Sequence, residues 1–241
     1  MRLLLIRHGD PDYANDTLTE KGVKEAKLLA ERLAGENIRD IYVSPLGRAQ
    51  RTAQETLEKL GRTAVTLDWL QEFTVSIYLP GEEKRHSIWD FMPSFLDKHR
   101  GLYSAEEWLN EPYIQNSEVP MRYAQVCSAL DSLLEEHGYR RKGTYYEAVR
   151  ANTDTLVFFC HLGLTGVLLS HLFHTSPVAI LQSFAGTPTS VTEVVTEERE
   201  EGIVQFRANW LGDVSHLYKN GEKPAFRSAG YRETALSEGR K

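Results

Sequence analysis

The chain has little cysteine, and this limits the class of protein that it can be. Of its 241 residues only Cys127 and Cys160 are cysteines, too few for the disulfide framework of a small secreted domain. Both lie among regularly spaced apolar residues, so we expect free, buried thiols. Free thiols fit the reducing cytoplasm, where we expect the protein to reside.

A long apolar run is also missing from the start of the sequence. In MRLLLIRHGD, four apolar residues end at once in a charged pair. This run is too short for a signal peptide, and a helix that spans a membrane needs about 20 apolar residues. We therefore expect no membrane association.

The sequence has no excess of positive charge. It carries 28 Lys and Arg against 34 Asp and Glu, for a formal net charge of −6. Non-specific binding to nucleic acid needs a broad basic surface, so we expect no nucleic-acid partner. An anionic ligand must instead be held by a local cluster of cations.

What the sequence does contain is an α/β pattern. Its 41% hydrophobic and 26% charged residues are ordinary for a globular protein. Apolar runs that predict buried strands alternate with amphipathic segments that predict helices. The predicted order is strand 3–6, helix 19–35, strand 40–45, helix 46–61 and strand 64–73. This order favours a mostly parallel central sheet with helices on both faces.

Residues 74–117 interrupt the alternation. They are rich in aromatic residues and predict an inserted cap of helices and loops, whose aromatics mainly pack the cap's own small core. Downstream we expect a helix at 117–138, a polar loop at 138–152, a buried strand at 154–160, a helix after it, and a final hairpin that turns at Glu201 and Gly202. We expect residues 1–220 to form a single domain and residues 221–241 to form a loose polar tail.

Basic and titratable side chains follow the predicted strands. Arg7 and His8 follow the first strand, and Arg48 follows the second. Glu72 follows the third strand, and His161 follows the late one. In an open α/β sheet, ligands bind beyond the carboxyl ends of the strands, so these side chains should meet there. Two arginines and two histidines near helix N-termini make a strong site for a dianion, because guanidinium groups match phosphate oxygens.

Taken in order, these motifs resemble one known family. The stretches LLLIRHGD, LTEKGVKEA, YVSPLGRAQRTA, LQEF and FFCHLG are similar to those of the histidine phosphatase superfamily, also called phosphoglycerate mutase-like. The resemblance covers most of the chain and leaves out the cap and the tail. Arg-His-Gly is a weak motif alone, but together with SPLGRA and a late His-x-Gly it is highly specific.

The resemblance implies a phosphatase that uses no metal and no other cofactor, and that hydrolyses a small phosphorylated substrate through a phosphohistidine. It implies that His8 is the nucleophile and that Arg7, Arg48 and His161 bind the phosphoryl group. Asn15 lies in the loop where some members of the family add a phosphate contact. The oligomeric state stays open, a homodimer included.

The physics of phosphoryl transfer agrees with these roles. Negative charge sits on the oxygens of the transferred group, and positioned cations stabilise it. His8 must be neutral to attack phosphorus. The reference pKa of histidine is about 6.5, and neighbouring guanidinium groups lower it further.

The leaving alkoxide needs a proton, which a carboxylic acid can donate. The resemblance implies Glu72 for this role. The sequence after Glu72 departs from the family pattern, so Glu82, Glu83 and Asp90 remain alternatives. Arg51 is a further departure, since the family usually has Gln at that position; we expect Arg51 to be a surface residue.

Other phosphate and metal chemistries fit the sequence less well. DPDY (10–13) lacks the strand-end Asp of the metal-dependent aspartyl phosphatases, and CHLGLTG has Gly166 where a cysteine phosphatase loop needs Arg. His171 and His174 lie at adjacent helical positions without a Cys or carboxylate companion nearby in sequence.

Two functional alternatives remain besides the phosphatase. One is a phosphoglycerate-type phosphomutase, which would need further cations for a second acidic group. The other belongs to a different class: a non-catalytic module that binds a phosphorylated ligand. We favour the hydrolase because no Arg-rich segment follows Glu72 and because every position of the chemistry is occupied.

Overall fold

The structure is a computed structural model that describes residues 1–225; residues 226–241, most of the predicted tail, lie outside the described part. The strands are β1 (Arg2–Arg7), β2 (Pro11–Asp12), β3 (Thr17–Leu18), β4 (Ile38–Val43), β5 (Val65–Thr66), β6 (Ser76–Tyr78), β7 (Arg85–Ser87), β8 (Tyr139–Lys142), β9 (Tyr145–Ala148), β10 (Thr155–Cys160), β11 (Val191–Glu200) and β12 (Ile203–Asp213). The helices are α1 (Glu20–Leu33), α2 (Gly47–Leu60), α3 (Pro93–Leu96), α4 (Pro112–Gln115), α5 (Val119–Glu136), α6 (Leu162–Leu172), α7 (Pro177–Ser183) and α8 (Ser215–Tyr218).

The central sheet has eight strands in the order β5-β4-β10-β1-β11-β12-β9-β8. The first four are parallel to one another. From β1 onward the pairs are antiparallel, so β11 and β9 run against the other six strands. The predicted mostly parallel sheet is confirmed, and so is the final hairpin, β11–β12.

The chain order brings the carboxyl ends of three strands together at one end of this sheet. The connection from β1 through α1 to β4 leaves a gap between the two strands, and β10 fills it from much later in the sequence. The carboxyl ends of β1, β10 and β4 therefore lie side by side where the strand order reverses, which is where open α/β sheets bind ligands.

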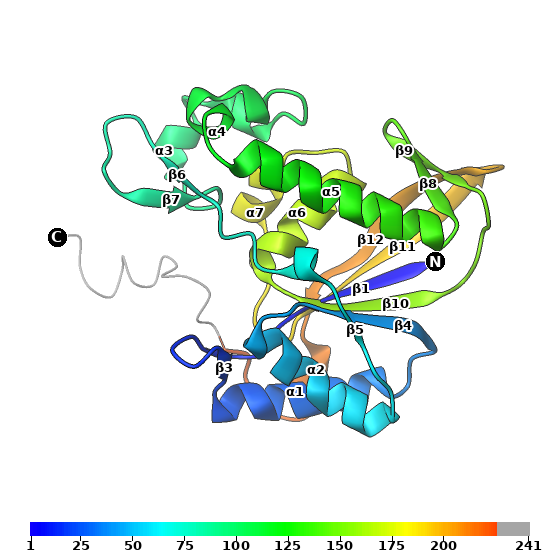
Figure 1. Ribbon diagram of the computed structural model, residues 1–241. Coiled ribbons are helices and arrows are strands. Elements are labelled where there is room, and N and C mark those ends of the chain that lie inside the picture. Colours follow the sequence, from blue (N-terminus) through cyan, green and yellow to red (C-terminus); the bar gives the residue numbers. More distant parts are fainter. Residues whose placement is uncertain (226–241) are drawn as a thin grey trace.

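Helices cover both faces of the sheet (Figure 1). On one face α1 and α2 pack their apolar sides on alternate residues of β1, β4 and β10. The side chain of Thr19 accepts the N–H of Gly22 and begins α1, while Gly61, at φ 61°, ends α2 in a left-handed conformation. On the other face lie α5, α6 and α7 (Figure 1).

The cap shares its core with that second face. Trp108 and Ile114 of the cap are buried in the same apolar cluster as Leu5 and Phe158 of the sheet. The predicted internal packing accounts for only part of the cap, a stack of Phe91, Phe95 and His99 with Tyr113 edge-on to Phe95. A segment of this size buries little apolar area by itself, so it depends on the sheet and α5 for the rest.

One local prediction is wrong. Residues 138–152, predicted as a polar loop, form the β8–β9 hairpin at the edge of the sheet. Tyr139 and Tyr146 are buried, charged residues lie between them, and Gly143 takes φ 61° in the turn. Apolar and polar residues do alternate in this stretch, but its many charged residues made the sequence resemble a loop.

Two expectations from composition can be compared with the described residues. Cys127 and Cys160 are free and buried, as predicted. No helix within residues 1–225 is long and apolar enough to cross a bilayer.

Candidate active site

The carboxyl ends of β1, β4 and β10 bring together the cations that the sequence analysis singled out. Arg7 lies opposite Cys160 in the β1–β10 pair, so His8 and His161 emerge side by side, with ring centres 5.2 Å apart. Arg48, in the first turn of α2, is close enough that its charge lowers the pKa of both histidines.

The hydrogen bond of His8 determines its tautomer. His8 is 2% exposed, and its Nδ1 lies 2.8 Å from the carbonyl oxygen of Gly9. A carbonyl only accepts hydrogen bonds, so Nδ1 carries the proton and Nε2 keeps a free lone pair. Burial, and after it the charge of Arg7, lower the pKa of His8 to about 3. His8 is therefore neutral near pH 7.

His161 is fully buried beside it. Its Nε2 shares a hydrogen bond of 2.8 Å with Oγ of Ser44, which leaves β4. Its Nδ1 is buried and has no partner among the described residues. Burial and then the neighbouring His8, Arg48 and Arg7 lower the pKa of His161 to about 2. His161 is thus a neutral group with one ring nitrogen to offer to a ligand.

Each arginine is held by one oxygen and keeps a further donor. Arg7 donates to the carbonyl oxygen of Gly186 at 2.5 Å, and Arg48 donates to the Asp16 carboxylate at 2.6 Å. Asp16 also accepts the N–H of Gly47 at 2.7 Å. The Nε atoms of both arginines are buried without a partner within residues 1–225. Buried, unsatisfied cationic donors are costly unless an anion accepts from them.

Glu72 lies at the N-terminus of α6. Its Oε1 accepts the backbone N–H groups of Phe73, at 2.8 Å, and Leu164, at 2.9 Å. Gly163 is required here, because a Cβ on it would lie 2.8 Å from the same Oε1. The His-x-Gly spacing thus lets the carboxylate reach the helix end next to His161. Since Oε1 accepts two N–H groups, a proton on this carboxyl group belongs on Oε2.

The other predicted acids lie in the cap. Glu82 is 2.7 Å from Nε2 of His86, and Asp90 is 3.9 Å from its Nδ1. Glu83 is exposed. Glu82 and Asp90 thus contact His86 of the cap, and Glu83 follows Glu82 in the chain. Glu72, in contrast, contacts α6, the helix that follows His161.

Asn15 lies in the loop between β2 and β3. It is exposed, and its side-chain amide donates to Asp12 at 2.7 Å. In this conformation the amide is engaged within its own loop.

Several residues at the site were missed by the sequence analysis. Ser44 and Asp16 orient His161 and Arg48 through the contacts given above. Tyr13 lies with its ring centre 6.5 Å from the His8 ring, and Trp89 of the cap reaches Gly163. Ser44 stood in the SPLGR motif and could have been noticed, but no sequence signal marked Trp89.

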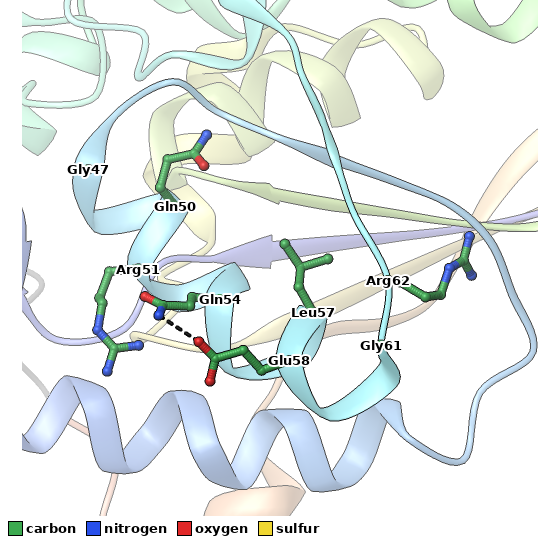
Figure 2. A pocket seen from close by; sticks show the side chains of 8 residues that line it. All are labelled: Gly47, Gln50, Arg51, Gln54, Leu57, Glu58, Gly61 and Arg62. Carbon is green, nitrogen blue, oxygen red and sulfur yellow. Dashed lines mark hydrogen bonds between the residues drawn. The ribbon is translucent and has the colours of Figure 1, made fainter.

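Arg51, His171 and His174 lie apart from these contacts. Arg51 is one of the residues that line a pocket along α2 (Figure 2), whose volume is about 700 Å³. Its side chain pairs with Glu55 at 2.7 Å. His171 contacts Asp131 at 2.9 Å, whereas His174 faces Glu106. The two histidines therefore share no partner in the described structure.

The site thus belongs to an α/β protein whose buried arginines and neutral histidines are arranged to receive an anion. The model of the histidine phosphatase superfamily (branch 1) matches residues 3–209. The chain belongs to this superfamily, as its motifs led us to expect, and it is an enzyme of the phosphomonoester hydrolase type.

Two individual relatives share between a quarter and a third of their aligned residues with this chain. Phosphoserine phosphatase 1 of Hydrogenobacter thermophilus is 25% identical over 216 residues, which cover 85% of this chain and 91% of the relative. A probable phosphoglycerate mutase of Yersinia pestis is 31% identical over 86 residues, 32% of this chain and 40% of the relative.

Solved structures support the fold. A mutant phosphoserine phosphatase of Entamoeba histolytica, in complex with phosphoserine, matches with a TM-score of 0.59 at 19% identity and covers 90% of this chain and 98% of its own. A mycobacterial glucosyl-3-phosphoglycerate phosphatase matches with a TM-score of 0.58 at 21% identity, covering 88% and 98%.

Proposed function

We propose that this phosphatase hydrolyses a small phosphomonoester through a phosphohistidine on Nε2 of His8, without a metal ion. The observation that carries the proposal is the state of His8: it is buried, it is neutral, its Nδ1 proton is held by Gly9, and its Nε2 lone pair is free. The unsatisfied Nε donors of Arg7 and Arg48 lie at the same strand ends. Together they supply a nucleophile and an anion cradle.

In the first step, Nε2 of His8 attacks phosphorus while the bond from phosphorus to the ester oxygen breaks. The electron pair of that bond moves to the leaving oxygen, which takes the proton from Oε2 of Glu72. Arg7, Arg48 and Nδ1 of His161 hold the phosphoryl oxygens, where the negative charge concentrates.

In the second step, the Glu72 carboxylate takes a proton from water, and the water oxygen attacks phosphorus. The bond from phosphorus to Nε2 breaks, its electron pair returns to His8, and inorganic phosphate leaves. Two displacements thus replace one difficult reaction, and one carboxyl group serves in both as acid and then as base.

The decisive experiment is hydrolysis of 4-nitrophenyl phosphate in the presence of a chelator. Wild-type protein should turn over, and His8→Ala should lose at least about 10³-fold in kcat, as removal of a catalytic nucleophile does. His174→Ala, which removes a half-exposed histidine just after α6, serves as the matched control. Activity that requires added metal, or that survives in His8→Ala, would contradict the mechanism.

A phosphomutase is the second candidate, supported by the 86-residue similarity to a probable phosphoglycerate mutase. It would pass the phosphoryl group to a second hydroxyl instead of water. Incubation with 3-phosphoglycerate distinguishes the two: release of inorganic phosphate supports the hydrolase, whereas conversion to 2-phosphoglycerate without phosphate release supports the mutase. Binding of phosphate without any turnover would favour the non-catalytic module.

A further inference from the structure

Two aromatic side chains border the phosphoryl site, and the proposed mechanism uses neither. Tyr13 belongs to the loop between β2 and β3, and Trp89 follows β7 in the cap. In Figure 1 this loop and the β6–β7 hairpin project at the same end of the molecule, the loop below the sheet and the hairpin above it.

Tyr13 lies against Arg48 and His8. Its ring centre is 5.5 Å from the guanidinium carbon of Arg48, and its ring stands edge-on to His8 at 6.5 Å between ring centres. The side chain is 67% exposed, so the ring has a free surface that a bound ligand can contact.

Trp89 lies beside the proposed proton donor. A Cβ placed on Gly163 would be 2.6 Å from Cη2 and Cζ3 of the Trp89 ring and 2.8 Å from Oε1 of Glu72. The indole edge and the carboxylate therefore converge on one residue. Because Glu72 must reach the leaving oxygen, the carbon atoms attached to that oxygen lie next to Trp89.

The charges at the border also limit the substrate. Arg7 and Arg48 are engaged by the phosphoryl group, and the charged side chain that contacts Arg48, Asp16, is a carboxylate. A carboxylate on the alcohol part of the substrate would meet like charge there. A flat apolar group would meet two aromatic surfaces, which stabilise such contacts beyond simple burial.

Building on the proposed function, we propose that Tyr13 and Trp89 select phosphomonoesters whose alcohol part is flat and apolar over those whose alcohol part carries a carboxylate. The test compares 2-phenylethyl phosphate with propyl phosphate. Both are alkyl esters with similar leaving groups, so a difference in kcat/KM reports contact with the alcohol part and not leaving-group chemistry. Phosphoserine is the carboxylate-bearing third substrate.

Wild-type protein should prefer 2-phenylethyl phosphate to propyl phosphate by about 10-fold, the effect of one or two aromatic contacts. Tyr13→Ala and Trp89→Ala should each reduce this preference by about 3- to 10-fold, because each should lower kcat/KM for 2-phenylethyl phosphate more than for propyl phosphate. Trp89→Phe should retain most of the preference. Trp210→Ala, which removes a 53% exposed tryptophan on β12, is the matched control and should change neither ester.

Binding separates this inference from the proposed function. Calorimetry with 2-phenylethylphosphonate and propylphosphonate measures the same preference without turnover. Tighter binding of the phenyl compound, weakened in Trp89→Ala, supports the inference even if the enzyme hydrolyses neither ester. Equal binding of the two phosphonates, equal losses on both esters in the variants, or a wild-type preference for phosphoserine would overturn it.

Discussion

At the scale of single residues, the site depends on groups that stay neutral or unsatisfied inside the protein. His8 and His161 are buried beside two guanidinium groups, which disfavours their charged forms. The same burial leaves Nε of Arg7 and of Arg48 without a partner among the described residues. The folded protein therefore bears a cost at these residues that a bound phosphoryl group would relieve.

The role of Glu72 can be tested with two kinds of ester. Glu72→Gln keeps the shape of the side chain but removes the proton, so it should reduce kcat for alkyl phosphates by about 10²-fold or more. The aryloxide of an aryl phosphate leaves without protonation, so the rate of the first step should fall far less for these esters. A nucleophile that accepts the phosphoryl group in place of water isolates that step. Glu82→Gln and Asp90→Asn are the controls. Equal losses on both kinds of ester would assign the proton to another group.

The lowered pKa values of the two histidines make stability depend on pH. Because these pKa values in the folded state lie far below about 6.5, the unfolded chain binds more protons between pH 6.5 and 3. The free energy of unfolding therefore carries no cost from these histidines above pH 6.5. As the pH falls below 6.5, it decreases by up to about 1.4 kcal/mol per pH unit for each histidine.

Urea unfolding at pH 7, 6 and 5 measures the effect. His8→Asn should lose less stability over this range than the wild type, because it lacks one of the histidines that only the unfolded state protonates. His174→Asn, at a half-exposed position, should follow the wild type. A His8→Asn curve parallel to that of the wild type would show that His8 titrates normally in the folded protein.

At the scale of elements, close backbone crossings position the site. Gly9 and Gly22 lie where the segment after β1 crosses the first turn of α1, and a Cβ on Gly22 would lie 2.3 Å from the carbonyl oxygen of Asp10. Gly163 plays the same part at α6, where it admits Glu72 and Trp89. These glycines allow helix ends to approach the catalytic segments closely.

Replacement of Gly163 by Ala tests this close approach. Alanine normally favours a helix over glycine, but here its Cβ must displace the Trp89 ring and the Glu72 carboxylate. We expect a loss of about 1–3 kcal/mol in stability and a reduced kcat. Gly35→Ala is the control, since its Cβ would meet only the carbonyl oxygen of Arg32 at 3.8 Å. A Gly163→Ala variant as stable and active as Gly35→Ala would refute the argument.

Glu25 of α1 joins two other segments. It is fully buried, and its carboxylate accepts the N–H of Asp10 at 3.0 Å and that of Ala225 at 3.2 Å. Burial raises its pKa to about 7. Glu25→Ala would leave both N–H groups unsatisfied and should destabilise the protein by about 2 kcal/mol, with a lower kcat because Asp10 follows the catalytic motif.

Glu31→Ala on the same helix is the matched control for Glu25→Ala. Glu31 is exposed and pairs with Lys59 at 2.8 Å, a surface contact that contributes little. Urea unfolding and kcat of the two variants provide the comparison. The inferred role of Glu25 fails if Glu25→Ala and Glu31→Ala both match the wild type in stability and kcat. The two hydrogen bonds of Glu25, to Asp10 and to Ala225, would then contribute little.

At the scale of the whole molecule, we propose that residues 1–220 fold as one domain, with the cap as part of it. The proposal is supported by the apolar cluster that Trp108 and Ile114 of the cap share with β1 and β10. The Trp108 ring also packs edge-on against Tyr123 of α5, with centres 4.9 Å apart. A shared core leads to a single cooperative transition.

Trp108→Ala tests this unity. The side chain is 1% exposed, so its removal should cost about 3–5 kcal/mol and shift the whole unfolding curve. Far-UV and near-UV circular dichroism should report one coincident transition in the wild type and in the variant. Two separate transitions, with only the first shifted in the variant, would show that the cap unfolds by itself.

Much of the framework was predictable because its signals are local. Apolar periodicity located β1, β4, α1, α2 and β10, and the parallel-sheet rule then placed Arg7, His8, Arg48 and His161 at one edge. The β8–β9 hairpin was missed because charged residues fill its solvent-facing positions. The position of Asn15 depended on a turn within its own loop, which its neighbour Asp12 determines.

The sequence alone therefore determined the fold class, the family, and the histidines and arginines that follow the strands, because each of these depends on residues that are close together in the chain. Tertiary structure alone decided how Ser44 meets His161 across 117 positions and how Glu72 reaches Leu164 across 92. It also decided that Trp89 of the cap borders the site. Such contacts arise from packing between distant segments, and no local pattern encodes them.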